Sequence, residues 1–213
     1  MRTIMVLNAK GGCGKSTIAT NLASYYAYIE EKNVVLVDFD PQGSSLDWLA
    51  ARGEEWPEIK GIAGFKENVR IPKTVDVVIF DAPARVQGRE LANLVRRVET
   101  IIVPVLPSPI DIRAAAHFIK DLLLNGKISR KETKVAVVAN RVKEHTLIYQ
   151  TLHAFLKSLK IPFVASLRDT QNYIHAEERG VGIFEMAPSK VWHDLEQWEP
   201  LLKWLRSKRS RAG

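Results

Sequence analysis

This 213-residue sequence contains a single cysteine, Cys13. One cysteine excludes an intramolecular disulfide and an all-cysteine metal site. The five histidines lack the spacing of metal ligands, which argues against a zinc site. Long hydrophobic runs are missing too. None approaches the roughly 20 residues of a membrane-spanning helix, and the first apolar run is too short for a signal peptide. We therefore expect a cytoplasmic protein.

Acidic residues are outnumbered. The chain has 31 lysines and arginines against 24 aspartates and glutamates, a formal net charge of +7. This sign favours a polyanionic partner, either nucleic acid or an anionic membrane surface. Basic residues without an intervening acid follow Glu199, namely Lys203, Arg206, Lys208, Arg209 and Arg211. We expect a single domain over residues 1–205 and a basic tail over residues 206–213. A solvated tail without a partner is the alternative.

Apolar runs of strand length alternate with longer amphipathic stretches. The clear runs are residues 4–7, 34–37, 77–80, 101–105 and 135–138. Continuous β-branched runs are typical of parallel strands buried on both faces. The stretches between them predict helices, at residues 17–29, 110–124, 146–159 and 189–205. The alternation predicts an α/β fold, a doubly wound and mostly parallel sheet with helices on both faces. The irregular residues 52–73 are expected to hold a short strand and loops.

A glycine-rich loop separates the first predicted strand from the first predicted helix. It reads Ala9-Lys10-Gly11-Gly12-Cys13-Gly14-Lys15-Ser16-Thr17. Strand, glycine-rich loop and helix form the setting of a P-loop, whose backbone N–H groups converge on phosphate oxygens. Lys15 would reach the β- and γ-phosphates, and the Ser16 hydroxyl would ligate Mg²⁺. The expected nucleotide contacts are Gly11, Gly12, Cys13, Gly14, Lys15, Ser16 and Thr17.

Polar residues follow three of the predicted strands. Asp38, Asp81 and Asn140 each come directly after an apolar run or close to its end. The carboxyl ends of parallel strands share one edge of the sheet, where ligands bind in such folds. An apolar run followed by aspartate is typical of a Walker B segment, so we expect Asp81 to hold Mg²⁺ through a bound water. Caps at strand ends remain the alternative for Asp38 and Asn140.

The loop departs from the common P-loop at its start. Ala9 stands where a glycine is usual, and a second lysine, Lys10, follows it. The form Lys-Gly-Gly-x-Gly-Lys-Ser resembles the deviant Walker A loop of the ParA/MinD family of positioning ATPases. The string Asp38-Phe39-Asp40-Pro41-Gln42 is similar to switch I of ParA proteins. The resemblance implies that Lys10 reaches the nucleotide of a partner subunit, that Asp40 orients the attacking water and that Asp38 lies near Mg²⁺.

The same resemblance implies a function. ParA-type proteins are weak Mg²⁺-dependent ATPases that form a homodimer with ATP and bind double-stranded DNA of the nucleoid without sequence preference. They position a cargo whose adaptor protein stimulates hydrolysis. Here Lys10, Lys15 and Asp40 would be the catalytic residues, Ser16, Asp38 and Asp81 would serve the metal, and Asn140 would meet the adenine. The basic residues Lys203, Arg206, Lys208, Arg209 and Arg211 would bind DNA. The cargo could be a plasmid, a chromosome region or a protein compartment such as a carboxysome.

Two other functions stay open. A MinD-like protein would bind membrane through a C-terminal amphipathic helix, and residues 192–205 offer tryptophans and leucines with basic neighbours. However, Pro200 interrupts that run, the last helix is needed to cover the sheet, and Asp-Pro-Gln favours the ParA branch. A metabolic amidoligase related to cobyrinate synthesis shares such loops but needs a substrate pocket and usually an added domain.

Overall fold

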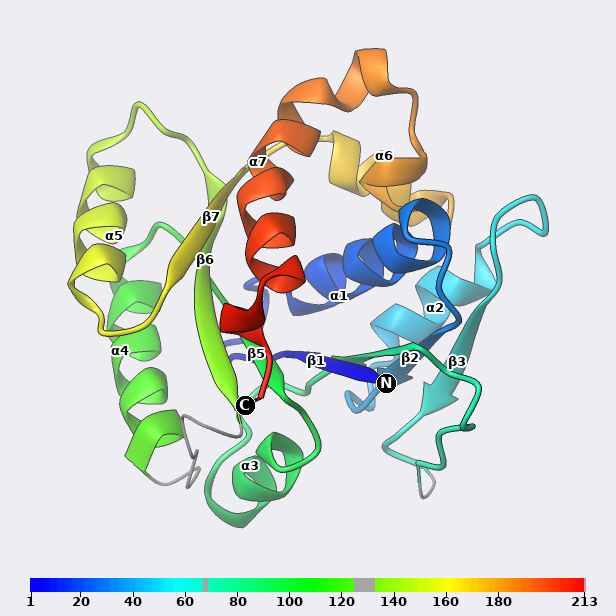
Figure 1. The fold of residues 1–213 in the computed structure, drawn as a ribbon. Coiled ribbons are helices and arrows are strands. Elements are labelled where there is room, and N and C mark those ends of the chain that lie inside the picture. Colours follow the sequence, from blue (N-terminus) through cyan, green and yellow to red (C-terminus); the bar gives the residue numbers. More distant parts are fainter. Residues whose placement is uncertain (67–68, 125–132, 213) are drawn as a thin grey trace.

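A seven-stranded sheet organises the computed structural model, which describes residues 1–66, 69–124 and 133–212 (Figure 1). The strands are β1 (Arg2–Val6), β2 (Val34–Asp38), β3 (Ile59–Ala63), β4 (Val77–Asp81), β5 (Thr100–Val105), β6 (Lys134–Val142) and β7 (Phe163–Arg168). Their order is β3-β2-β4-β1-β5-β6-β7, and every neighbouring pair is parallel. All strands therefore end at one edge of the sheet, here called the carboxyl edge, and begin at the other, the amino edge.

Helices cover both faces of this sheet (Figure 1). They are α1 (Lys15–Ser24), which continues into a π-helical turn (Tyr25–Ile29), α2 (Ser44–Ala50), α3 (Gly88–Val95), α4 (Pro109–Leu124), α5 (Leu147–Ser158), α6 (Asn172–Glu178) and α7 (Pro188–Arg206). Two 3₁₀ turns follow α6 and α7, at Ile183–Glu185 and Lys208–Ser210. Among the described residues, no helix has the length and hydrophobicity to cross a membrane.

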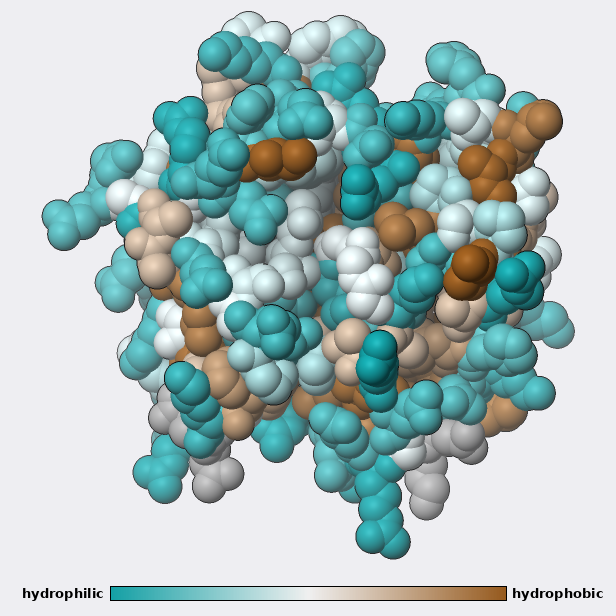
Figure 2. Space-filling model, turned by 180° about the vertical axis from the view of Figure 1, so that it is seen from behind, coloured by the Kyte–Doolittle hydropathy of each residue, from teal (hydrophilic) through white to brown (hydrophobic). Residues whose placement is uncertain are grey.

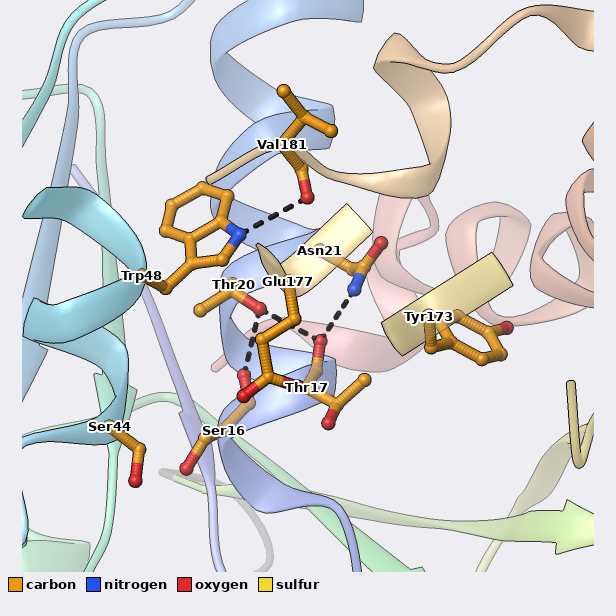
Figure 3. A pocket seen from close by; sticks show the side chains of 9 residues that line it. All are labelled: Ser16, Thr17, Thr20, Asn21, Ser44, Trp48, Tyr173, Glu177 and Val181. Carbon is orange, nitrogen blue, oxygen red and sulfur yellow. Dashed lines mark hydrogen bonds between the residues drawn. The ribbon is translucent and has the colours of Figure 1, made fainter. Parts of the chain in front are cut away.

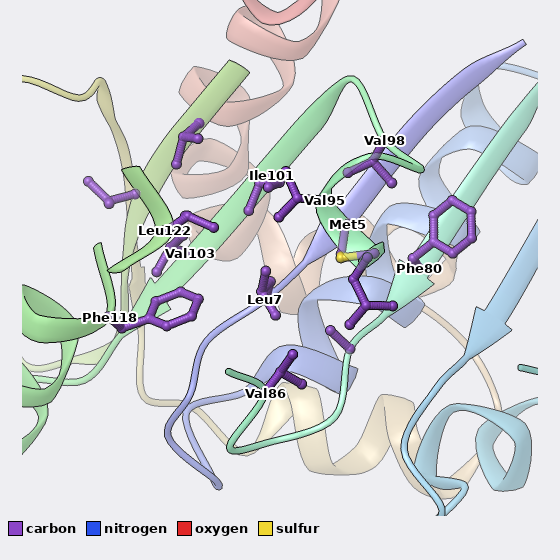
Figure 4. Packing of buried hydrophobic residues seen from close by; sticks show 14 of the residues in the cluster. Met5, Leu7, Phe80, Val86, Val95, Val98, Ile101, Val103, Phe118 and Leu122 are labelled. Carbon is purple, nitrogen blue, oxygen red and sulfur yellow. The ribbon is translucent and has the colours of Figure 1, made fainter. Parts of the chain in front are cut away.

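Two hydrophobic cores result from the alternation of side chains along the strands. Met5 of β1 and Phe80 of β4 point to the face covered by α3, α4 and α5 (Figure 4). Their neighbours Ile4 and Ile79 point to the opposite face, which α1, α2 and α7 cover. Because each central strand is buried on both sides, its sequence is a continuous apolar run, as the sequence analysis assumed.

The predicted fold class is confirmed, and several helices and strands extend beyond their predicted ranges. Each of the five predicted strands and four predicted helices is present, and residues 52–73 contain β3 as expected. The first helix begins at Lys15 rather than Thr17, and β6 runs on to Val142. Four elements were not predicted: α2, α3, β7 and α6.

Pro200 does not interrupt the last helix, contrary to the sequence-based expectation. Helix α7 runs continuously from Pro188 to Arg206 with Pro200 inside it. A proline removes one helical hydrogen bond, and here the burial of Trp198, Leu201 and Leu205 against the sheet offsets that loss. The helix is therefore part of the core.

The two ends of the chain meet at the amino edge. The Arg2 guanidinium donates to Glu99 Oε1 at 2.6 Å and to Ser210 Oγ at 2.9 Å. The hydroxyl of Thr100, the first residue of β5, donates to the carbonyl of Ser210. Ser210 is fully buried, so the chain as far as this residue is fixed to the first residues of β1 and β5.

Candidate functional site

The glycine-rich loop lies at the carboxyl edge, between β1 and α1. Gly12 and Gly14 adopt φ angles of +73° and +90°, which residues with a side chain rarely adopt. A Cβ on Gly14 would come within 2.1 Å of the Asn140 amide nitrogen, so this position has no room for a larger residue. Helix α1 begins directly after Gly14 without a side-chain cap. Its first N–H groups are therefore free to bind an anion together with those of the loop.

The loop is held by contacts to its own backbone. The Lys15 ammonium and the Cys13 thiol both donate to the Lys10 carbonyl, each at 3.2 Å. The Asn140 amide donates to the Cys13 carbonyl at 2.9 Å and is buried. Burial also raises the pKa of the Cys13 thiol, so the thiol stays protonated and acts as a donor. Asn140 thus supports the loop in this structure, and its contact with adenine stays a prediction.

Two buried carboxylates lie beside the loop. Asp38 ends β2 and Asp81 ends β4, and the two residues are register partners. Ser45 of α2 connects them, because its N–H donates to Asp38 at 3.0 Å and its hydroxyl to Asp81 at 2.7 Å. The N–H of Asp40 donates to the other Asp38 oxygen at 2.9 Å. Ser45 was not predicted from the sequence, since only the folding of α2 brings it to the strand ends.

Asp81 has a raised pKa and a carboxylate oxygen without a hydrogen bond. Burial raises its pKa to about 6, although the hydrogen bond from Ser45, the nearby Ser16 hydroxyl and the charge of Lys15 oppose this shift. One of its oxygens, Oδ1, is buried and has no hydrogen-bond partner among the described residues. A buried carboxylate oxygen without a partner is costly, and a cation would relieve that cost.

These residues fit a magnesium ion. Mg²⁺ prefers oxygen ligands and is usually bound by one or two carboxylates together with phosphates and water. Asp81 offers the unpartnered oxygen, the Ser16 hydroxyl lies within hydrogen-bonding reach of Asp81, and Asp38 is adjacent. In the described part of the chain, no three His, Cys, Asp or Glu side chains form a closed metal cage. An ion here would therefore need ligands from a bound phosphate or from water.

The side chain of Asp40 lies beside these groups, and only its backbone N–H belongs to their hydrogen-bond network. It is half-buried, and its Oδ1 accepts from the N–H of Gln42 at 3.0 Å. Gly43 closes this turn with a φ of +71°, and α2 starts at the next residue. The side chain of Asp40 thus stands at the mouth of the site, where a carboxylate can accept a hydrogen bond from water.

Asn8, which follows β1, connects the backbone of Lys10 to strand β5. Its N–H donates to the Asn8 side chain at 3.2 Å, and Asn8 in turn donates to the carbonyl of Pro104 in β5. The Lys10 ammonium lies 3.7 Å from the Asp111 carboxylate and is 37% exposed. The lysine is therefore near the surface of the carboxyl edge rather than buried in the loop as Lys15 is.

A comparison with family models matches residues 4–183 to the CobQ/CobB/MinD/ParA nucleotide binding domain. The matched segment contains the loop, both buried carboxylates, the end of β1 and the whole of the other six strands. The chain belongs to this family.

Several relatives in the family are similar over most of their length. Maintenance of carboxysome distribution protein A of Halothiobacillus neapolitanus is 27% identical over 196 residues, covering 86% of this chain and 87% of that protein. Chromosome-partitioning ATPase Soj of Thermus thermophilus is 50% identical over 193 residues, covering 74% and 76%. A putative plasmid partition protein of Borrelia burgdorferi, solved with AMPPNP, has a TM-score of 0.74 at 16% identity, covering 95% and 98%. The last comparison confirms the fold.

A small polar pocket adjoins the family's glycine-rich loop (Figure 3). Residues of α1, α2 and α6 line it together with Val181, namely Ser16, Thr17, Thr20, Asn21, Ser44, Trp48, Tyr173, Glu177 and Val181. The Trp48 indole donates to the Val181 carbonyl at 3.1 Å, and Arg52 donates to the Gly180 carbonyl at 3.0 Å. These contacts fasten α2 to the segment after α6. No sequence motif pointed to this arrangement.

The basic residues of the C-terminus lie at the amino edge, away from the loop. Ser210 fixes this segment against Arg2 and Thr100, where β1 and β5 begin. Arg206 donates to Glu199 at 2.6 Å and to the Tyr25 hydroxyl. The other cations of the segment form no ion pair within the described residues, namely Lys203, Lys208, Arg209 and Arg211.

Proposed function

We propose that this chain is a ParA-type ATPase that dimerises on binding ATP, binds DNA without sequence preference and positions a cargo in the cell. The observation that carries the proposal is the loop with two lysines beside two buried carboxylates, one of which has an unpartnered oxygen. The family match and relatives named for carboxysome distribution and chromosome partition support it.

In the proposed reaction, residues of this chain bind the triphosphate and place the water. Loop N–H groups and Lys15 bind the phosphates, for which the Lys15 ammonium leaves the Lys10 carbonyl. Mg²⁺, held by Ser16 and Asp81, would neutralise phosphate charge. Asp40 holds the attacking water at the mouth of the site, with Asp38 fixing the Asp40 backbone.

The homodimer would form through the carboxyl edges of two chains. The ammonium of Lys10 is partly exposed there, so it can extend to the nucleotide of a second copy. A cation supplied in trans stabilises phosphate charge only when two subunits meet, which couples ATP binding to dimerisation. An adaptor protein on the cargo would stimulate hydrolysis and so separate the dimer.

DNA binding is proposed for the basic cluster, which we define as Lys203, Arg206, Lys208, Arg209 and Arg211. In a dimer joined at the carboxyl edges, the two clusters would lie at opposite ends. Each would bind weakly alone, and their linkage would raise the apparent affinity through effective concentration. ATP would thus switch DNA binding on, and the protein would associate with the nucleoid.

A membrane-binding function is less well supported. Helix α7 buries Trp198, Leu201 and Leu205 in the core, so it cannot offer these side chains to lipid while the sheet stays covered. The side of the molecule opposite to Figure 1 is mainly hydrophilic, with small separate apolar patches (Figure 2). The family description includes CobQ and CobB as well as MinD and ParA, so the family match alone does not separate an amidoligase from a positioning ATPase.

One set of assays tests these functions on a single preparation. We expect slow Mg²⁺-dependent release of phosphate from ATP, an ATP-dependent dimer by light scattering, and ATP-dependent retention on double-stranded DNA of random sequence. Retention should fall steeply as salt rises, because each phosphate contact releases condensed counterions. Binding to anionic liposomes with no DNA retention would replace the DNA-binding function by the membrane-binding one. ATP turnover only with an added carboxylic acid and an ammonia donor would favour the amidoligase.

A further inference from the structure

The ion pair between Lys10 and Asp111 joins the loop to α4 within one chain. The Lys10 ammonium lies 3.7 Å from Asp111 Oδ1, and the Asp111 side chain is only 10% exposed. A carboxylate that is mostly buried needs a compensating charge or hydrogen bonds. Among the described residues, Asp111 Oδ1 has no hydrogen-bond partner, so Lys10 is the group that compensates it.

The geometry of Asp111 is fixed by the start of α4. The Ser108 hydroxyl accepts from the N–H of Asp111 at 3.1 Å and bonds to Asp111 Oδ2. This arrangement is a helix N-cap, which orients the carboxylate at the third residue of α4. Oδ2 is thus used by the cap, while Oδ1 is left to face the loop.

We propose that Asp111 is a positioning residue that holds Lys10 in its own subunit until a second ATP-bound copy arrives. The inference rests on the proposed role of Lys10 in trans. Lys10 must leave Asp111 to reach the partner's nucleotide, so the ion pair opposes dimerisation. It sets the ATP concentration at which the dimer forms and keeps Lys10 away from the phosphates of its own chain.

A purely structural role for Asp111, as part of the helix cap, is separable by mutation. Asp111→Asn removes the charge opposite Lys10 and keeps a polar group of the same size in the cap. Ser108→Ala removes the cap and leaves the charge of Asp111. If Asp111 acts only through the cap, the two variants should behave alike.

The first experiment measures the ion pair without ATP. A small amine-acylating reagent is applied to nucleotide-free protein, and the modification of Lys10 relative to the exposed Lys157 is followed by peptide mass spectrometry. A paired ammonium reacts more slowly. We expect Asp111→Asn to raise the relative rate at Lys10 about two- to fivefold, the scale of a partly exposed ion pair, and Ser108→Ala to leave it unchanged. Equal rates in wild type and Asp111→Asn would overturn the inference.

The second experiment measures dimerisation by light scattering as ATP is titrated. We expect Asp111→Asn to reach half-dimerisation at about two- to fivefold less ATP than wild type, and Ser108→Ala to match wild type. Lys10→Ala should need more ATP than wild type to dimerise, and adding Asp111→Asn to it should not lower that requirement, because the effect acts through Lys10. A shift that persists there refutes the inference. If wild type forms no dimer with ATP, the proposed function fails as well. If wild type dimerises with ATP and Asp111→Asn shows no shift, the inference about Asp111 is refuted and the proposed function is not.

Discussion

The two edges of the sheet differ in how their buried charges are compensated. At the carboxyl edge, the Asp81 carboxylate has no ion-pair partner among the described residues and keeps a buried oxygen without a hydrogen bond, and Gly12 and Gly14 hold the loop in left-handed backbone. At the amino edge, the Arg2 guanidinium is paired with Glu99 and bonded to Ser210, and only its Nε lacks a hydrogen-bond partner among the described residues. The same parallel strands connect both edges, so the difference does not come from the fold class.

The comparison indicates where the chain gives up stability for function. Buried charge and strained backbone persist only when the surroundings enforce them, and they gather at functional sites. Arg85 in the loop after β4 and Arg141 near the end of β6 add to this with φ angles of +64° and +52°, whereas at the amino edge Glu31, before β2, has a φ of +51°. We therefore expect changes at the carboxyl edge to alter chemistry and changes at the amino edge to alter stability or DNA binding.

The largest effect is expected for Lys15→Ala at the carboxyl edge. Losing a buried ammonium that binds phosphate should weaken ATP binding about a hundredfold or more. A direct nucleotide titration measures this, with Lys157→Ala on the exposed face of α5 as the control. Wild-type affinity in Lys15→Ala would place the nucleotide elsewhere.

Asp40→Ala should separate binding from hydrolysis. Because the Asp40 side chain has no hydrogen bond to the loop or to the buried carboxylates, and the backbone bond of Asp40 to Asp38 is kept in the variant, ATP affinity should stay within about twofold, while turnover falls about a hundredfold. The ATP-bound dimer should then persist in light scattering. Normal turnover in this variant would mean that another residue positions the water.

Asp81→Asn should make the nucleotide-free protein more stable. The pKa of Asp81 is about 6 in the folded chain against an ordinary 3.8, so the folded state binds more protons between these values. The free energy of unfolding therefore falls as pH rises from about 4 to 6, by about 3 kcal/mol. At pH 7.5 the variant should gain about 1–3 kcal/mol in urea unfolding and lose the Mg²⁺ dependence of nucleotide binding.

The gain in Asp81→Asn should shrink as the pH is lowered toward 4, where wild-type Asp81 is protonated as well. Asp47→Asn, at an exposed position of α2, is the matched control and should show no such trend. A variant that is less stable than wild type at pH 7.5 would contradict the assignment of Asp81 as a destabilising buried charge.

At the amino edge, replacing two cations of the basic cluster should weaken DNA binding. The double variant Lys208→Ala/Arg209→Ala should lose about tenfold in affinity for random double-stranded DNA and flatten the salt dependence by about two phosphate contacts. The control removes two exposed lysines from α4 and α5, Lys120 and Lys157. Equal losses in both would show that net charge matters and that the cluster does not.

The smallest effect is expected for Ser210→Ala. The variant loses hydrogen bonds from Arg2 and to the Leu205 carbonyl, and should be destabilised by about 1 kcal/mol in urea unfolding. ATP affinity should not change, because the proposed nucleotide site lies at the other edge. A change in ATP affinity would mean that the two edges are coupled.

Much of the carboxyl edge could be predicted from sequence because it is built from local signals. Long apolar runs mark the central strands, and the residues directly after them, Asp38 and Asp81, come to one edge by topology alone. Ser45 could not be predicted, since α2 has only seven residues and its place depends on tertiary packing. Strand β7 was missed because it lies at the sheet margin, where most of its residues are only partly buried and a serine interrupts its apolar residues.

The sequence alone could not show that the basic residues after Glu199 lie at the amino edge. The charges after Glu199 are visible in the chain, but which edge they occupy depends on the direction in which α7 crosses the sheet. The continuity of α7 through Pro200 was likewise decided by burial of its neighbours rather than by local propensity.

The fluorescence of Trp48 can report on the surroundings of the site. Its indole N–H is bonded to Val181 across the pocket next to Ser16, and α2, which carries it, begins shortly after Asp40. Indole emission shifts when this hydrogen bond breaks or water enters. With the other four tryptophans replaced by phenylalanine, Trp48 fluorescence would therefore report in real time whether α2 moves when nucleotide binds, without any attached dye.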